Sequence, residues 1–151
     1  MLGSRQEEHK IFDFRFDWTP DLDIRLGEID NYHKKIFRVG RDVEQLLRIQ
    51  CMGVEEKQLI DITCELKDTM SQSFCEEENY MWRYEYSKMT AHREAHYRYR
   101  QELDSIDLIL LRENPNKEVQ HIKDIITRWT LEHMLTADKN MADAIRGQIH
   151  G

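Results

Sequence analysis

The sequence predicts an all-α protein, an up-down-up-down antiparallel four-helix bundle that follows an extended N-terminal arm. Two observations support this fold class. The 151 residues include only 6 Gly and 2 Pro, which allows long uninterrupted helices and leaves few tight turns. Four segments repeat apolar residues at helical spacing, and the short connections between them favour antiparallel neighbours. We therefore expect residues 1–23 to form an arm that packs on a single bundle domain, residues 24–151.

The predicted arm carries aromatic residues at alternate positions, just before the pair Thr19-Pro20. They are Phe12, Phe14, Phe16 and Trp18. Alternation is typical of an extended segment with one buried side, but an isolated strand would lack a pairing partner. We therefore expect an extended arm whose aromatic side lies against the bundle.

The first two helices are predicted from about residue 27 to 50 and from about residue 54 to 84. The first repeats Ile29, Ile36, Val43 and Leu47, includes His33 in the same row, and is followed by Gly53 as a stop signal. The inward row of the second helix consists of Leu59, Leu66, Met70, Ser73, Glu77 and Met81.

The third predicted helix begins near Thr90, a good N-cap, and ends at Asn114-Pro115-Asn116. Its stripe consists of His92, His96, Tyr99, Leu103, Ile106 and Leu110. The fourth helix is predicted from about residue 117 to 145. Its inward row consists of Ile122, Ile126, Trp129, His133 and Met141.

Charge and composition exclude several classes of partner. Lys and Arg number 22 against 29 Asp and Glu, a net charge of −7, which argues against nucleic acid because phosphate binding needs clustered cations. The chain contains no apolar run near the roughly 20 residues that cross a bilayer, and no signal peptide, so we expect no membrane partner. Cys51, Cys64 and Cys75 show no C-x-x-C spacing and are expected to be buried or partly buried reduced thiols in a cytoplasmic protein.

Six residues able to bind metal occur on the four predicted helices. They are His33, Glu77, His92, His96, His133 and Asp138. His92 and His96 are four residues apart on one helical face, the spacing that lets two imidazoles share one metal ion. Glu77 lies in an apolar row, where a carboxylate is costly unless it is paired or bound to metal. Histidines and carboxylates converging in a bundle core favour a pair of iron ions.

Each of these residues also has a structural interpretation. The histidines can be core residues with satisfied hydrogen bonds, and acidic clusters such as 76–78 are often solvated helix faces. Asp138 follows His133 by five residues, an offset of about 140° on a regular helix, so it joins the site only by reaching sideways or through a local widening of the helix. Asp30 is either an acceptor for an imidazole N–H or a helix-start residue, and we favour the latter.

Several stretches form a specific pattern in their order, number and spacing. They are Phe16-Asp17-Trp18, Ile29-Asp30-Asn31-Tyr32-His33-Lys34, Phe74-Cys75-Glu76-Glu77-Glu78-Asn79-Tyr80-Met81, His92-Arg93-Glu94-Ala95-His96, and Trp129-Thr130-Leu131-Glu132-His133 with Asp138. By this pattern the chain resembles the bacterial hemerythrins from about Phe14 to Met141. The resemblance implies two non-haem iron ions with an oxo or hydroxo bridge and O2 or a related small ligand as partner.

The resemblance also implies a role for each matched residue. His92, His96 and His133 would hold one iron, Glu77 and Asp138 would bridge the two irons, and His33 would serve the second iron, whose vacant position takes the ligand.

One position departs from the family pattern H-F-x-x-E-E-x-x-M, because Ser73 stands where the first histidine is expected. A serine side chain is too short to replace an imidazole. Three options are open: a water fills the space beside Ser73, another side chain (Glu76, Glu78, Met70 or a tyrosine) swings in, or only the three-histidine iron fills well. Fewer nitrogen donors on the second iron favour the ferric state, which damages reversible O2 storage more than sensing.

Three functions from different classes follow from these observations. The first is an oxygen- or redox-sensing module with a more open second iron site, working with a signalling partner or a fused output domain. The second is an O2 carrier, store or delivery protein. The third is a structural bundle whose metal site has partly decayed. We expect no enzyme activity, because the histidine-rich set differs from the glutamate-rich pattern of di-iron oxidases.

Overall fold

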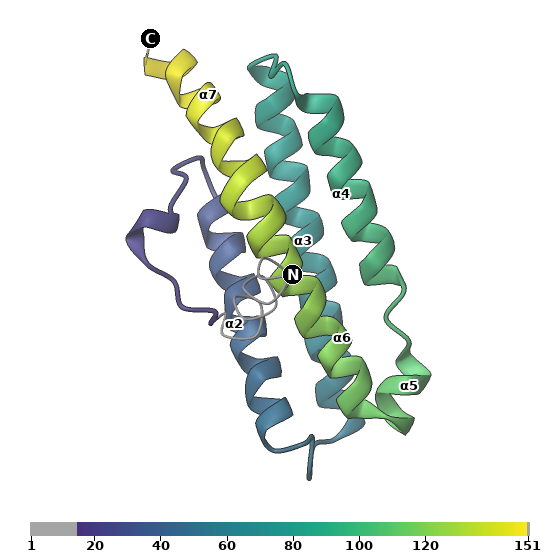
Figure 1. Ribbon diagram of the computed structural model, residues 1–151. Coiled ribbons are helices and arrows are strands. Elements are labelled where there is room, and N and C mark those ends of the chain that lie inside the picture. The colour runs from purple at the N-terminus through teal and green to yellow at the C-terminus, as the bar shows by residue number, and fades with distance from the viewer. Residues whose placement is uncertain (1–14, 151) are drawn as a thin grey trace, which may run out of the picture.

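The computed structural model describes residues 15–150, and within them all regular structure is helical. The elements are η1 (Pro20–Leu22), α2 (Ile29–Arg48), α3 (Glu56–Arg83), α4 (Met89–Asp104), α5 (Leu108–Glu113), α6 (Pro115–Arg128), the π-helix η2 (Trp129–Asp138) and α7 (Lys139–His150) (Figure 1). The helices α6, η2 and α7 follow one another without a break and form one long helical segment.

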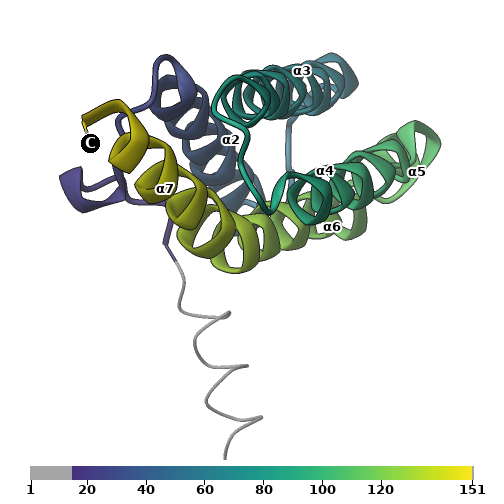
Figure 2. The same cartoon turned by 90° about the horizontal axis from the view of Figure 1, so that it is seen from above.

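The long helices close into a ring. Helix α2 contacts α3, α3 contacts α4, α4 contacts α6, and α6 contacts α2 again, so the direction alternates around a common core (Figure 2). This arrangement confirms the predicted all-α four-helix bundle.

Side chains fix where several helices begin. Asp30 accepts hydrogen bonds from the backbone N–H groups of Ile24 (2.8 Å) and Arg25 (2.9 Å), which ties the preceding chain to the start of α2. Asp30 is therefore a helix-start residue, as favoured from the sequence. The Gln58 side chain accepts from the Glu55 N–H (3.0 Å), half of a capping box that satisfies a free donor at the start of α3.

The third predicted helix differs from the expectation in two respects. Thr90 is not its N-cap, because α4 begins at Met89 with Lys88 in that position. The helix also breaks after Asp104, since the Asp107 side chain accepts from the N–H groups of Ile109 and Leu110 and so starts α5 as a separate helix. After the break, the position that faces the core lies one residue later in the chain than the predicted stripe places it.

That shift changes which leucine reaches the core. Leu111 is fully buried, whereas Leu110, which the stripe predicted to point inward, is only partly buried.

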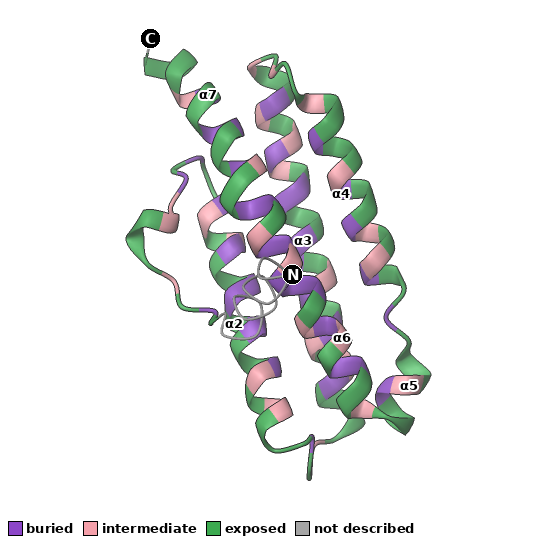
Figure 3. Cartoon of the chain, in the orientation of Figure 1, coloured by how far each residue is buried: buried purple, intermediate pink, exposed green. Residues whose placement is uncertain are grey.

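The core contains the inward rows that the sequence predicted for the second and fourth helices (Figure 3). At the described end of the arm, Phe16 is buried, and its ring and that of Trp18 both meet Phe37 of α2 edge to face, at 5.7 and 5.2 Å between ring centroids. Phe12 and Phe14 lie outside the described residues, and the division at residue 23 stays a prediction.

Two expectations about the cysteines were wrong. Cys51 is buried as expected, but Cys64 and Cys75 are exposed on the outer face of α3. Within residues 15–150, no helix combines the length and the apolar character that a membrane span requires.

Candidate metal centre

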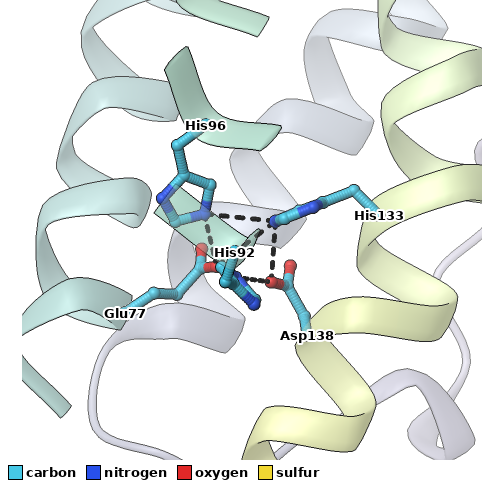
Figure 4. A group of neighbouring side chains, drawn as sticks. All are labelled: Glu77, His92, His96, His133 and Asp138. Carbon is cyan, nitrogen blue, oxygen red and sulfur yellow. Dashed lines mark hydrogen bonds and ion pairs between the residues drawn. The ribbon is translucent and has the colours of Figure 1, made fainter. Parts of the chain in front are cut away.

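Five of the six sequence-predicted residues meet at one point inside the bundle. They are Glu77 of α3, His92 and His96 of α4, and His133 and Asp138 of η2, all buried, and each offers one ligand atom within 4.8 Å of the others. Figure 4 shows these side chains pointing toward one another from three different helices. Only the folded bundle assembles this set.

The two carboxylates each direct one oxygen toward these histidines. Glu77 Oε1 lies 3.0 Å from His92 Nε2, 3.1 Å from His96 Nε2 and 3.6 Å from His133 Nε2. Asp138 Oδ1 lies 3.0 Å from the Nε2 atoms of both His92 and His133. Two oxygens and three nitrogens therefore surround one small volume.

The other oxygen of each carboxylate faces His33 of α2. His33 Nε2 lies 3.4 Å from Asp138 Oδ2 and 3.7 Å from Glu77 Oε2. Both carboxylates thus stand between His33 on one side and several imidazoles on the other, three for Glu77 and two for Asp138. A carboxylate with one oxygen on each side is the arrangement that bridges two metal ions.

Several donor atoms of the cluster have no hydrogen-bond partner among the described residues, whereas a metal ion would satisfy them. Asp138 is fully buried, yet within residues 15–150 neither of its oxygens has a partner with hydrogen-bond geometry, and the same holds for both nitrogens of His33. His96 Nε2 and His133 Nε2 face each other at 3.1 Å, which is stable only with a proton or a metal ion between them. Buried polar atoms without partners are expensive, so this set indicates a site for bound cations.

The electrostatics of the cluster agree with this interpretation. Burial alone would raise the pKa of Glu77, but its contacts with Asp138 and the histidines hold the pKa well below the ordinary value. Burial alone would lower the pKa of His133, but Asp138 and Glu77 raise it to about 10. The same two carboxylates raise the pKa of His92 against the effect of burial.

The π-helix explains how Asp138 reaches the site. On a regular α-helix the five-residue step from His133 would point the carboxylate about 140° away. In η2 the hydrogen bonds join residues five apart, which brings His133 and Asp138 back to nearly the same face. The local widening considered from the sequence is therefore present, and such segments are frequent at functional sites.

Ser73 is fully buried beside the site, and its hydroxyl donates to Glu77 Oε2 at 2.8 Å, on the His33 side. Two of the side chains considered as replacements point elsewhere. Glu76 lines a surface cleft with Asn79 and Trp82, and Glu78 lies on the outer side of His96. Ser73 thus contacts a candidate bridging carboxylate.

Sequence reasoning missed the role of Glu78. Its Oε2 lies 3.0 Å from His96 Nδ1, the ring nitrogen that faces away from the cluster. The hydrogen bond to His96 is the main cause that lowers the pKa of Glu78. Two signals were present in the sequence: Glu78 matches the second glutamate of the pattern H-F-x-x-E-E-x-x-M, and its position next to Glu77 directs it to a neighbouring face of the helix.

The fold and the cluster define a class of protein, a four-helix bundle with a buried histidine–carboxylate cluster of the kind that binds metal. No family model matches the chain. Curated relatives named bacteriohemerythrin do match it. The protein of Clostridium acetobutylicum is 27% identical over 128 residues, which covers 85% of this chain and 99% of that protein. Those of Pseudomonas paraeruginosa and Pseudomonas aeruginosa are 26% identical over 130 residues, covering 85% of this chain and 80% of theirs. These relatives confirm the resemblance to the bacterial hemerythrins.

Proposed function

We propose that the protein binds two non-haem iron ions in this cluster and, through them, O2 or a related small ligand. The observation that carries the proposal is the placement of the two carboxylates. Glu77 directs one oxygen toward three imidazoles and Asp138 directs one oxygen toward two of them, while the other oxygen of each faces His33. His92, His96 and His133 would hold one ion and His33 the other, with the carboxylates between them. Mixed imidazole and carboxylate ligands are typical of iron.

An iron pair would supply one-electron redox chemistry at each ion. The residues of this chain supply the surroundings. Glu77 and Asp138 place negative charge between the two positions, which favours two cations close together. Contact of the site with bulk solvent is small, because its side chains are buried, the Phe74 ring stacks on His96 at 4.1 Å and Trp129 packs against His33 at 5.1 Å between ring centroids. A dry site strengthens the attraction between these carboxylates and the cations.

We further propose a sensing role for the site rather than O2 storage. Within residues 15–150, His33 is the one imidazole on its side of the carboxylates, and Ser73 occupies the helix position where the family pattern has a second histidine. With fewer neutral nitrogen donors, the ion held by His33 would be oxidised more readily. A sensor tolerates such oxidation, whereas a carrier loses its function. Its output would come from a partner or from a domain outside this sequence.

Metal loading tests the proposal. Protein loaded anaerobically with Fe(II) should bind about two irons per chain, and exposure to air should produce charge-transfer colour. His133→Ala should lose metal, whereas His121→Ala should not, because His121 contacts Ser105 away from the cluster. Rapid conversion to a ferric spectrum that persists on degassing supports a sensor, and colour that disappears on degassing supports a carrier. Protein that takes up no iron and keeps its stability would overturn the proposal in favour of a structural bundle.

Ser73→His tests the assignment of the second iron. A new imidazole at this position should tighten binding of the ion held by His33 and lengthen the life of any oxygenated form. Because Ser73 is fully buried, the larger side chain should also cost the metal-free protein about 1–3 kcal/mol of stability through overpacking. Unchanged metal content and oxidation rate would count against the role given to this position.

A further inference from the structure

We propose that Glu78 is a positioning residue, which holds His96 in the tautomer that binds metal and strengthens its donor nitrogen. The inference rests on the proposed function, since it concerns one ligand of the proposed iron pair. Glu78 itself does not reach the cluster. It stands on the outer side of His96, where α3 and α4 face each other, and is partly exposed.

The hydrogen bond from His96 determines where its ring protons lie. A carboxylate can only accept, so His96 Nδ1 must donate to Glu78 Oε2 across their 3.0 Å contact. In the neutral ring, Nε2 then carries the lone pair. Nε2 is the atom directed into the cluster, 3.1 Å from Glu77 Oε1. Glu78 therefore keeps His96 ready to bind a cation without a change of tautomer.

Two arginines hold the Glu78 carboxylate in place. Arg93 Nε lies 3.1 Å from Glu78 Oε1, and Arg100 Nη2 lies 3.6 Å from Glu78 Oε2. Arg100 also lies over the Phe74 ring, 5.3 Å from its centroid, and that ring stacks on His96 with an interplanar angle of 13°. The His96 ring is thus fixed at its edge by Glu78 and on its face by Phe74.

This support distinguishes His96 from the other histidines of the cluster. Among residues 15–150, none of His33, His92 and His133 has a hydrogen bond from Nδ1 to a carboxylate. A carboxylate on the outer nitrogen makes an imidazole a stronger electron donor toward a metal. Glu78 should therefore tighten the binding of the ion held by His96. It should also favour the ferric state of that ion, compared with the same ligands without Glu78.

Three variants of the full chain test this role. Glu78→Ala removes both the acceptor and the charge, and Glu78→Gln keeps an acceptor without the charge. Glu76→Gln, two residues away on the same helix, is the matched control. Glu76 lines a surface cleft with Tyr80 and Arg83 and has no contact with His96. We expect Glu78→Ala to weaken metal binding by about 10–100-fold. The metal affinity of Glu78→Gln should lie between those of Glu78→Ala and the wild type, and the affinity of Glu76→Gln should equal that of the wild type.

Two further readouts separate this role from a general loss of structure. In metal-free protein, NMR should show a slowly exchanging His96 Nδ1 proton that Glu78→Ala abolishes and Glu76→Gln retains. In iron-loaded protein, the first reduction potential should rise in Glu78→Ala relative to Glu76→Gln.

The outcomes distinguish the two proposals. If the wild type binds two irons but Glu78→Ala matches Glu76→Gln in affinity, potential and NMR signal, Glu78 has no positioning role while the metal site stands. If the wild type binds no metal, the proposed function fails, and a His96 proton lost only in Glu78→Ala would show that the tautomer is nevertheless set by Glu78.

Discussion

Replacing Ser73 with alanine tests how the cluster is held before metal binds. The Ser73 hydroxyl donates to Glu77 Oε2 at 2.8 Å, and both side chains are fully buried. Hydrogen bonds to charged groups contribute about 1.5–3 kcal/mol, and both partners of this one are buried away from bulk solvent. We therefore expect Ser73→Ala to lower the free energy of unfolding of the metal-free protein by about 1.5–3 kcal/mol.

Thermal unfolding of chelator-treated protein measures this effect. For a chain of this size each 1 kcal/mol changes Tm by roughly 2–4 °C, so Ser73→Ala should lower Tm by roughly 3–12 °C. Ser71→Ala is the matched control, because Ser71 is an exposed residue of the same helix. Both substitutions gain the same helix propensity, so the difference between them isolates the buried hydrogen bond.

Metal loading should reduce the difference between the two variants. Once cations hold the Glu77 carboxylate, the lost serine donor matters less, so the difference in Tm should shrink in iron-loaded protein. Equal Tm values for Ser73→Ala and Ser71→Ala without metal would refute the reasoning, since the hydrogen bond would then contribute nothing to the folded state.

Three other predictions follow from the contacts described. Because the carboxylates raise the pKa of His133 to about 10, a metal ion must displace its proton below that pH. Affinity measured by anaerobic competition should therefore rise roughly tenfold per pH unit between about pH 6.5 and 8.5, and a flat profile would contradict this. A Cβ at Gly40 would lie 2.5 Å from the Phe16 ring, so Gly40→Ala should cost about 1–3 kcal/mol in urea unfolding. Gly147→Ala, with nothing within 4 Å, should instead gain about 0.5–1 kcal/mol. Cys51 should react with a thiol reagent only after unfolding, whereas the two exposed cysteines should react at once.

The inward rows of the bundle could be predicted because they depend on periodicity alone. Glu77 follows Met70 by seven residues and precedes Met81 by four, which placed a carboxylate in an apolar row, and the structure buries all three completely. His133 follows Trp129 by four residues and is buried with it. A costly residue in a buried row was therefore the strongest local signal of the site.

Features that depend on side-chain hydrogen bonds could not be predicted in this way. The break between α4 and α5 arises because Asp107 caps the next helix and its N–H donates to Glu118, eleven residues later. The contact between Glu78 and His96 joins two helices across eighteen residues. The Asp107 cap is local, but the partners in the contacts with Glu118 and with His96 are distant in the sequence, and the residues between them do not specify the pairing.

The π-helix η2 depends both on the spacing of residues in the sequence and on contacts that form only in the folded protein. The spacing between His133 and Asp138 is readable from the sequence, but on a regular helix it separates the two residues, so it argued against Asp138 as a ligand. A helix widens only where the surroundings offset the poorer geometry of its hydrogen bonds, and in η2 the widened segment directs both side chains into the same cluster. The irregularity is thus tied to the site itself. A functional residue that breaks the local period should therefore be tested against a change of helix type before it is discarded.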